Sequence, residues 1–456
     1  MKILILSPYP PYPPHGGGTM RIYQLIRGLA RRHDATCLSF VPDLAAEHAL
    51  APLQRICRVV VVRGPAQRSL AQRAWTTLAS PLPDMALRNA LPEYSAALRA
   101  LLATETFDII QAESIEMAGY LLQVMSYELR VQNSNDSNNS KLKTMPWSPS
   151  RSLPASLSLR SKVNSAKRQN SKLVLDQFNA EYLLQKRAFL ADARQPRRWH
   201  AAAYSLVQWL KLARYEARVM RECDAVLAVA DKDRATLLGC APNARISVVP
   251  NGVDTDYFSR AALVRERAGP LSFAAATLVF SGTLDFRPNV DALTWFAREV
   301  LPRLRARQPN LRLLVVGKRP APAMRQLAQA GLLMLTGEVP DARPYIAGAT
   351  VYIVPMRIGG GVRLKLLEAL ALEAPVVSTR MGAEGVTGLC GGEHCLLADD
   401  PADFAAAVLC LIDDPALGRQ LGAAGRALVR ERYDWSVIVP RLEAIYQDLR
   451  SATIAQ

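Results

Sequence analysis

A run of glycines followed by two cations and a carboxylate is the part of this chain best suited to chemistry. Residues 357–379 read RIGGGVRLKLLEALALEAPVVST. Gly359, Gly360 and Gly361 follow an apolar segment, and residues without a Cβ let the backbone turn tightly and bring its N–H groups close to a ligand. The sequence therefore predicts a phosphate-binding turn between a strand at 351–355 and a helix.

Two positive charges stand at the start of this predicted helix. Arg363 and Lys365 fall in its first turn, where the positive end of the helix dipole and both cations act on one anion, most naturally a diphosphate. Glu368 lies about one turn further on, where a carboxylate can accept hydrogen bonds from sugar hydroxyls. The alternative is an ordinary strand-to-helix turn with exposed charges.

Short β-rich runs alternate with helical patterns on both sides of this turn. In the C-terminal half the predicted strands are 277–282, 311–317, 333–337, 351–355 and 375–379. In the N-terminal half they are the first apolar run and then 36–40, 59–62, 107–112, 173–176 and 225–229, the last expected to end that domain. This alternation predicts an α/β chain of parallel strands with crossover helices, with ligands at the carboxyl ends of the strands.

The C-terminal half resembles the C-terminal domain of retaining GT-B glycosyltransferases of family 4, and among them the bacterial exopolysaccharide sugar transferases. The matching segments, within residues 245 to 435, are FSGTLDFRPNVDA, VVGKRP, TGEVPDARPY, the run from Arg357 to Ala369, PVVST and GAEG. Their joint order and spacing are more specific than any single glycine motif. The resemblance implies two Rossmann-like domains facing across a cleft, with the last helix crossing back to the N-terminal domain.

Two positions depart from the family pattern. Family 4 enzymes commonly carry two glutamates seven residues apart; Glu368 matches the second, on the nucleotide ribose, and Gly360 stands at the first. The subgroup usually shows Asp-x-His-Asn-Ala-Glu-Tyr in the N-terminal half, with the histidine near the reacting centre, and here Phe178 replaces it. Phenylalanine can neither carry a proton nor donate a hydrogen bond. Either the histidine is dispensable, or Asn179 and Glu181 hold the sugar and the acceptor, or this copy is impaired.

A second glycine-rich turn, HGGG, follows the first predicted strand. By the resemblance, the amides of Gly17 and Gly18 face the donor across the cleft. A glycine-rich first turn also describes dinucleotide-binding sites, but the spacing is not GxGxxG and no acidic residue ends a recognisable second strand. Glu113 and Glu116 follow the strand at 107–112; they are either candidate general bases or solvated carboxylates at a helix start.

Composition and resemblance together divide the chain into an N-terminal acceptor-side domain, a nucleotide-sugar-binding domain and a crossover helix, at 1–245, 246–432 and 433–456. The VPNGVD turn at 249–254 marks the junction, and Asn-Gly is ordinary turn chemistry. Residues 125–171 are rich in Ser, Asn and Lys, and such a segment cannot bury enough apolar surface to offset its ordering entropy. We expect a disordered insertion there and a basic amphipathic helix at 209–221.

Positive charge is concentrated in the N-terminal domain. The chain has 56 Lys and Arg against 40 Asp and Glu, and the first 245 residues hold 33 and 19 of these. A basic acceptor domain suits an anionic membrane surface or a polyprenyl-diphosphate-linked acceptor, although a generally Arg-rich surface would look the same. The basic residues are dispersed and no nucleic-acid-reading module is recognisable, so nucleic acid is not expected as a partner.

The cysteine content and the hydropathy of the sequence indicate the cellular compartment that we expect for the protein. The seven cysteines include no CxxC pair, and Cys390 and Cys395 are too far apart in sequence for the usual zinc knuckle. Scattered cysteines fit a reducing cytoplasm. The first apolar run is only about five residues long before prolines end it, so it reads as a strand and not as a signal peptide, and no run reaches the ~18 to 20 apolar residues of a membrane span. We expect a cytoplasmic protein, either soluble or peripheral at the inner face of the plasma membrane.

The resemblance implies transfer of a sugar from a nucleotide-diphosphate donor to a glycan or lipid-linked acceptor, with retention, in exopolysaccharide or cell-envelope polysaccharide biosynthesis. Arg363 and Lys365 would stabilise the departing diphosphate, with Arg287 and the glycine amides as further donor contacts. No metal or other cofactor is expected, because no DxD-type pair follows a strand. The alternatives are a GT-B sugar-nucleotide epimerase, disfavoured by the presence of only five histidines, and a non-catalytic donor-binding scaffold.

Overall fold

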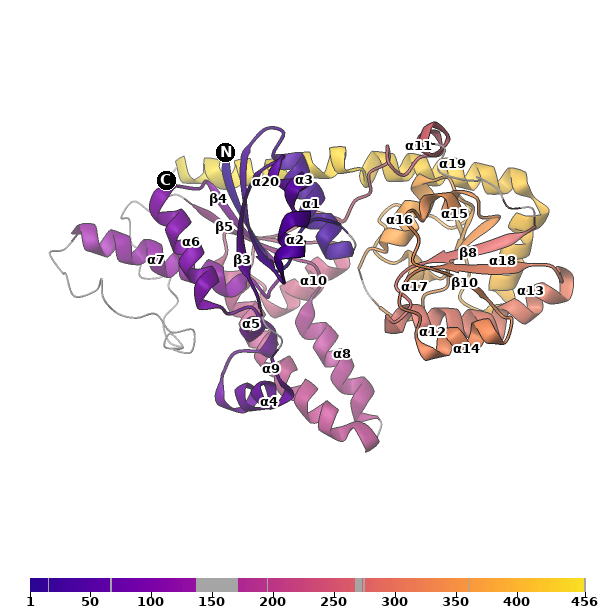
Figure 1. Cartoon of the computed structure of the whole chain (residues 1–456), viewed down its shortest axis with the longest axis horizontal. Helices are drawn as coiled ribbons and strands as arrows, with labels where there is room; N and C mark the ends of the chain where they lie inside the picture. The colour runs from indigo at the N-terminus through magenta and orange to yellow at the C-terminus, as the bar shows by residue number, and fades with distance from the viewer. Residues whose placement is uncertain are drawn as a thin grey trace. The chain divides into compact units, whose positions relative to one another are not determined.

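The chain folds into two compact units. The structure is a computed structural model, and it describes residues 1–14, 16–65, 68–136, 171–194, 196–266, 273, 275–359 and 361–454. Unit 1 comprises Met1–Val249 with Val439–Gln456, and unit 2 comprises Pro250–Ile438 (Figure 1). Each unit is a parallel sheet covered by helices, as the alternation of apolar strands and helical patterns predicts.

Unit 1 is built on a seven-stranded parallel sheet in the order β3-β2-β1-β4-β5-β6-β7. Its inner strands are mostly apolar and are buried on both faces, which is typical of a parallel sheet between helical layers. The strands are β1 (Lys2–Ser7), β2 (Asp34–Val41), β3 (Arg58–Arg63), β4 (Ile109–Glu113), β5 (Lys172–Gln177), β6 (Ala225–Ala228) and β7 (Ile246–Val248). The expectation that 225–229 is the last strand is therefore wrong: β7 is only three residues long, too short to show a pattern of its own.

Helices connect and cover these strands. They are α1 (Gly17–Leu29), α2 (Leu44–Ala49), α3 (Ala51–Gln54), α4 (Leu70–Ala79), α5 (Asp84–Arg88), α6 (Pro92–Thr104), α7 (Ala118–Asp136), α8 (Glu181–Ala193), the 3-10 turn η3 (Pro196–Arg198), α9 (Trp199–Glu222) and α10 (Asp231–Cys240). The predicted helix at 209–221 is the second half of α9. The segment predicted to be disordered from residue 125 begins inside α7, which continues to Asp136; its residues 137–170 lie outside the described residues.

Unit 2 is built on a six-stranded parallel sheet in the order β10-β9-β8-β11-β12-β13. The strands are β8 (Thr277–Ser281), β9 (Arg312–Val316), β10 (Met334–Gly337), β11 (Val351–Val354), β12 (Val376–Ser378) and β13 (Leu396–Leu397). The helices are α11 (Arg260–Glu266), α12 (Arg287–Trp295), the π-helical turn η4 (Phe296–Val300), α13 (Leu301–Arg307), α14 (Pro322–Gln329), α15 (Arg343–Ala347), α16 (Leu364–Ala371), α17 (Arg380–Ala383), α18 (Pro401–Asp413) and α19 (Pro415–Arg432). All five strands predicted here are present, and the two-residue β13 was not predicted.

The last helix, α20 (Trp435–Ile454), belongs to both units, because its residues up to Ile438 lie in unit 2 and the rest in unit 1. Tyr446 ties it to the sheet of unit 1 by donating a hydrogen bond to Oε1 of Gln111 at 2.5 Å. The predicted crossover helix is thus present. The boundaries differ slightly: unit 1 extends through β7 to Val249, and α20 begins at Trp435. No helix in the described part of the chain is long and apolar enough to span a membrane.

A buried ion pair holds α1 against the carboxyl end of β5. Arg21 donates from Nε and Nη2 to the two carboxylate oxygens of Asp176, at 2.7 and 3.0 Å, and both side chains are almost fully buried. Glu113, at the end of the neighbouring strand β4, is also fully buried. Burial, and then the charge of Asp176, raises the pKa of Glu113 well above its ordinary value. One arginine therefore neutralises a site where two carboxyl groups meet.

Replacing Arg21 with methionine is expected to lower the free energy of unfolding by about 3–5 kcal/mol, because breaking a buried ion pair leaves an uncompensated charge. Urea unfolding followed by tryptophan fluorescence measures this. Arg380→Met is the matched control: Arg380 pairs with Asp399, both are largely exposed, and such a pair contributes less than about 1 kcal/mol. Equal costs for the two variants would show that the buried pair does not hold α1 in place.

Candidate functional site

The strand order of unit 2 reverses between β8 and β11. From β8 the sheet continues to β9 and β10 on one side, and from β11 to β12 and β13 on the other. The loops after β8 and β11 therefore leave the same edge in opposite directions, and this is where parallel α/β sheets bind ligands. The predicted glycine turn follows β11, so it opens at this point.

Lys365 lies where three segments converge at this edge. Its Nζ donates to Oδ1 of Asn289, on α12, at 2.9 Å. The same nitrogen lies 3.8 Å from the ring centre of Phe280, on β8. After β8 the chain passes so close that a Cβ built on Gly282 would lie 2.8 Å from Nζ. The ammonium is thus fixed by an amide oxygen, an aromatic face and a glycine backbone.

Arg363 closes the other side of the turn. It is the N-cap residue of α16 and not a first-turn residue as predicted, whereas Lys365 does lie in the first turn. Gly359 and Gly361 have positive φ values of 128° and 72°, and a Cβ on Gly359 would lie 3.0 Å from Cζ of Arg363. These φ values favour glycine, and a Cβ at 359 would also displace the end of the Arg363 side chain. Gly360 lies outside the described residues.

Helix α16 places two ionisable side chains in this site, those of Lys365 and Glu368. Both are half-buried, and burial disfavours the charged form of each. The pKa of Lys365 is lowered to about 7 by burial and then by Arg363, against the opposing effect of Glu368. Burial raises the pKa of Glu368 to about 7, against the opposing effect of Lys365. Burial also lowers the pKa of Arg363, and Glu384 counteracts this. The structure thus holds two cationic groups whose charge an incoming anion would favour.

Two other arginines of unit 2 have different surroundings. Arg357 forms a bidentate pair with Asp291 at 3.1 and 2.9 Å, and its guanidinium lies 5.6 Å from the ring centre of Trp295. Arg287 is exposed at the first position of α12. Its predicted contact with the nucleotide donor stays a prediction. Asn289, two residues later, accepts a hydrogen bond from Lys365 and was not predicted as a site residue.

In unit 1 the strand order reverses between β1 and β4, and the second glycine turn follows β1. Gly17 and Gly18 are the first two residues of α1, so their amides are at a helix N-terminus. A Cβ on Gly18 would lie 3.1 Å from Cζ of Tyr9 and 3.3 Å from Cε2 of Phe178. The phenylalanine that replaces the subgroup's histidine therefore packs beside the predicted donor-facing turn.

Asn179 and Glu181 come together directly after β5. Nδ2 of Asn179 donates to Oε1 of Glu181 at 3.2 Å, and burial raises the pKa of Glu181. Glu216 of α9, which the sequence did not single out, accepts the backbone N–H groups of Glu181 and Tyr182 at 3.1 and 3.0 Å. It thereby fixes the start of α8. Burial raises the pKa of Glu216 to about 8.

Neither of the two glutamates predicted as candidate bases is a solvated carboxylate. Glu113 is fully buried and accepts from Nε2 of Gln111 at 2.7 Å. Glu116 accepts from Arg88 and Asn89, both at 3.0 Å, and burial raises its pKa. Glu113 thus belongs to the buried cluster that holds α1, and Glu116 to a local polar contact.

Three possible metal ligands of unit 2 lie together before β13: the ligand atoms of Cys390, Glu393 and His394 are within 4.8 Å of one another. Nδ1 of His394 accepts the backbone N–H of Cys390 at 3.1 Å, so a neutral ring carries its proton on Nε2. A histidine that ligates a metal through Nε2 needs the opposite tautomer. The arrangement therefore favours a structural role for His394.

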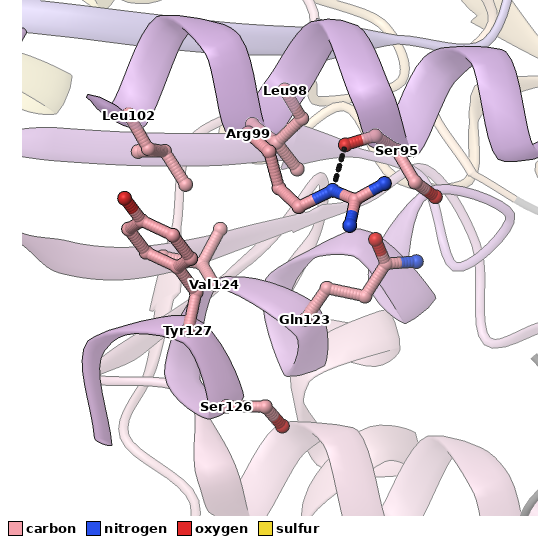
Figure 2. A pocket seen from close by; sticks show the side chains of 8 residues that line it. All are labelled: Ser95, Leu98, Arg99, Leu102, Gln123, Val124, Ser126 and Tyr127. Carbon is pink, nitrogen blue, oxygen red and sulfur yellow. Dashed lines mark hydrogen bonds between the residues drawn. The ribbon is translucent and has the colours of Figure 1, made fainter. Parts of the chain in front are cut away.

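A hollow between α6 and α7 is lined by Ser95, Arg99, Gln123, Tyr127 and four further side chains (Figure 2). Nε of Arg99 donates to the carbonyl oxygen of Ser95 at 3.2 Å, which turns the guanidinium along its own helix. None of the predicted site residues lines this hollow. We therefore place the candidate site at the switch point of unit 2.

Replacing Gly282 with alanine is expected to destabilise the chain by about 2–3 kcal/mol, because its φ of 148° is strained for other residues and the added Cβ meets Lys365. Gly331→Ala is the control: its φ is also positive, at 69°, but no atom lies within 4 Å of the added Cβ, so only about 1 kcal/mol of backbone strain is expected. Thermal unfolding compares them. If Gly331→Ala costs as much, close packing at Lys365 is not what requires glycine at 282.

Two family descriptions match the chain. "Glycosyl transferases group 1" matches residues 275–414, and "Glycosyltransferase Family 4" matches residues 188–257. The phosphatidyl-myo-inositol mannosyltransferase of Mycobacterium tuberculosis is 32% identical over 209 residues, which cover 44% of this chain and 53% of that protein. A GDP-mannose-dependent alpha-(1-6)-phosphatidylinositol monomannoside mannosyltransferase of Mycolicibacterium smegmatis is 28% identical over 254 residues, covering 52% and 65%. The chain thus spans about half to two thirds of the length of these curated relatives.

Solved structures share the fold across nearly the whole chain. Sucrose-phosphate synthase from Thermosynechococcus elongatus has a TM-score of 0.67 at 17% identity, covering 99% of this chain and all of that one. HepE of Anabaena, solved in complex with UDP, has a TM-score of 0.59 at 14% identity, covering 98% and 100%. The two parallel-sheet units, the crossover helix and the family matches lead to one conclusion. The chain has the fold of the GT-B glycosyltransferases, and its segments 188–257 and 275–414 match glycosyltransferase family models.

Proposed function

We propose that this chain transfers a sugar from a nucleotide-diphosphate donor to a hydroxyl group of a glycan or lipid-linked acceptor, with retention at the anomeric carbon. The observation that supports this best is the convergence of Lys365, Arg363 and the glycine turn at the switch point of unit 2. Two cations and a helix N-terminus directed at one place form a site for a diphosphate.

In the proposed reaction the bond between the anomeric carbon and the diphosphate oxygen breaks, and its electron pair stays on the diphosphate. The acceptor oxygen forms the new bond and its proton leaves with the diphosphate or the solvent. Charge therefore develops on the leaving group, and fixed donors directed at that charge contribute most to the rate. Lys365 and Arg363 would supply them without a metal ion, and Glu368 would accept hydrogen bonds from the ribose.

The pKa shifts also favour an anionic ligand. Burial lowers the pKa of Lys365 to about 7, so without a ligand the ammonium is poorly stabilised by its surroundings. A bound diphosphate supplies the missing negative charge and would raise that pKa again. Binding of the diphosphate would therefore offset the free energy that the fold loses by burying this lysine.

The names of the relatives and the charge of the chain support a setting for the proposed reaction. The mannosyltransferases matched above are named for phosphatidylinositol acceptors, which supports a lipid-linked acceptor here. The basic residues concentrated in the first 245 positions suit an anionic substrate or surface. We propose exopolysaccharide or cell-envelope polysaccharide synthesis at the cytoplasmic face of the membrane.

Lys365→Ala is expected to weaken nucleoside diphosphate binding by about 10- to 100-fold, since a hydrogen bond to a charged group contributes about 1.5–3 kcal/mol. Titration calorimetry with UDP, GDP and ADP measures binding. Release of nucleoside diphosphate from the matching nucleotide sugars, with membrane extract as acceptor source, measures turnover. Lys318→Ala is the control, because Lys318 is also a lysine of unit 2 but pairs with Glu338 at the surface.

One observation favours a second function, a non-catalytic donor-binding scaffold: Phe178 occupies the position of the subgroup's histidine and packs on the turn at Gly18. The same assay separates the two. Turnover by the wild type that is lost in Lys365→Ala supports the transferase. Turnover only in Phe178→His would mean that this copy has lost its chemistry, and donor binding without turnover in any variant would favour the scaffold.

At pH 8, binding of a diphosphate is expected to be accompanied by the uptake of protons by the protein. The pKa of Lys365 is lowered to about 7 in the free protein, so at pH 8 the lysine is mostly neutral, and a bound anion favours its protonation. Affinity should therefore fall as the pH rises above about 7. Calorimetry in buffers of different ionisation enthalpy counts the protons. Glu368→Gln removes the contribution of the other group with a pKa of about 7, and uptake that vanishes in this variant would exclude Lys365 as its source.

A further inference from the structure

Tyr9 follows β1 at the edge of unit 1 where the strand order reverses. Its backbone is held by two serine side chains of neighbouring strands. Oγ of Ser7, on β1, donates to the carbonyl oxygen of Tyr9 at 2.6 Å, and Oγ of Ser39, on β2, donates to the same oxygen at 3.1 Å. The sheet thus fixes the point from which the tyrosine side chain extends.

The side chain of Tyr9 reaches the start of α1. Its hydroxyl contacts the position that a Cβ of Gly18 would occupy, and Cε2 of Phe178 lies 3.3 Å from the same position. Phe178 is the first residue after β5, and β4 lies between β1 and β5 in the sheet. The tyrosine therefore reaches across the carboxyl end of β4, which is where a parallel α/β sheet binds ligands.

The hydroxyl of Tyr9 is half-buried, and the protein does not pair it. No hydrogen bond joins it to any residue that the structure describes. The hydroxyls of Tyr94 and Tyr446, in contrast, donate to protein oxygens at 2.7 and 2.5 Å. Polar groups withdrawn from water are normally paired in native proteins. A hydroxyl held at the switch point without a protein partner is available to a ligand.

The charges near this hydroxyl select the kind of ligand. Burial raises the pKa of Tyr9 well above its usual value, and the charges of three carboxyl groups add to this, those of Glu113, Glu116 and Asp176. The hydroxyl therefore keeps its proton and can donate it in a hydrogen bond. The same carboxyl groups disfavour a phosphate or another anion. The partner that fits is a neutral oxygen, such as a hydroxyl group of a sugar.

Acceptor groups follow Phe178 on the loop after β5. Asn179 and Glu181 are half-buried and joined by the hydrogen bond described above. Burial raises the pKa of Glu181, and the charge of Glu116 adds to this, as it does for Tyr9. Each sugar hydroxyl both accepts and donates hydrogen bonds. A phenol that donates and an amide and a carboxylate that accept are therefore matched to a sugar with several hydroxyl groups.

We propose that the Tyr9 hydroxyl binds a sugar substrate by donating a hydrogen bond to one of its hydroxyl groups at the switch point of unit 1. Phe178 beside it offers only an apolar ring, so Tyr9 supplies the donor at this place. The proposal rests on the proposed function, because it takes a sugar to be a substrate. The sugar belongs either to the nucleotide donor or to the acceptor, and the experiments below distinguish the two.

The first test asks whether the fold needs the hydroxyl. Tyr9→Phe is expected to leave the melting temperature within about 1 °C of the wild type, because no hydrogen bond within the protein is lost. The matched variant is Tyr94→Phe, which removes a buried hydrogen bond to the carbonyl oxygen of Leu38 and should lower the melting temperature by about 2–4 °C. An equal loss in Tyr9→Phe would mean that its hydroxyl is bonded within the protein, and the proposal would be wrong.

The second test asks whether turnover needs the hydroxyl. Release of nucleoside diphosphate from the nucleotide sugar, with membrane extract as acceptor source, should fall about 3- to 10-fold in kcat/KM for Tyr9→Phe, the effect of one neutral hydrogen bond. Tyr215→Phe is the control. Its hydroxyl is also unpaired among the described residues but lies in the core beside Gly119 of α7, so its removal should leave turnover unchanged. Unchanged turnover in Tyr9→Phe, or an equal loss in both variants, overturns the proposal.

Titration calorimetry identifies which sugar is bound. Weaker binding of the nucleotide sugar by Tyr9→Phe, with unchanged binding of the nucleoside diphosphate, assigns the hydroxyl to the donor sugar. Unchanged binding of both, with a higher requirement for membrane extract in turnover, assigns it to the acceptor sugar. A wild type without turnover counts against the proposed function. In that case equal binding of the nucleotide sugar by the wild type and Tyr9→Phe also overturns the role of Tyr9, and weaker binding by the variant supports it.

Discussion

The candidate site depends on one property of parallel sheets: where the strand order reverses, two neighbouring loops leave the same edge in opposite directions. In unit 2 the strands that meet there are β8 and β11, and the hydroxyl groups of Ser281 and Tyr352 join them at 2.6 Å. Only this adjacency lets Lys365 reach Asn289, 76 positions earlier in the chain. Glycine is favoured at 282 and 359, because the chain there adopts φ values of 148° and 128° and an added Cβ would displace the ends of the Lys365 and Arg363 side chains.

Local patterns in the sequence were sufficient to predict the elements that are formed by contiguous residues. Apolar runs between turn residues predicted nearly every strand, and the predicted glycine turn followed by cations lies at the switch point of unit 2, where we place the candidate site. The strands missed were β7 and β13, of three and two residues, which are too short to show periodicity. Arg363 was placed one position too far into its helix, because residue type does not distinguish an arginine that caps a helix from one inside its first turn.

Interactions between distant segments were not predictable. Arg21 and Asp176 are separated by 155 positions, and Glu216 fixes the start of α8 from another helix, so no local pattern marks either. The orientation of α4 was also hidden, since its periodicity alone places Trp75 and Leu78 in a core. Only the hydrogen bonds of Arg73 and Gln208 show that the polar side is the buried one.

The two units hold their positive charge in opposite ways. In unit 2 burial disfavours the charged forms of Lys365 and Arg363. Holding these charges without a bound anion lowers the stability of the fold, and in return the site can bind an anion at short range. In unit 1 exposed arginines such as Arg194 and Arg197 stay hydrated, cost little to keep charged, and act through a field that salt screens over about 8–10 Å. A soluble diphosphate needs the first arrangement because it must be oriented atom by atom. An extended anionic surface needs only the second, because attraction at this range does not depend on the orientation of single atoms.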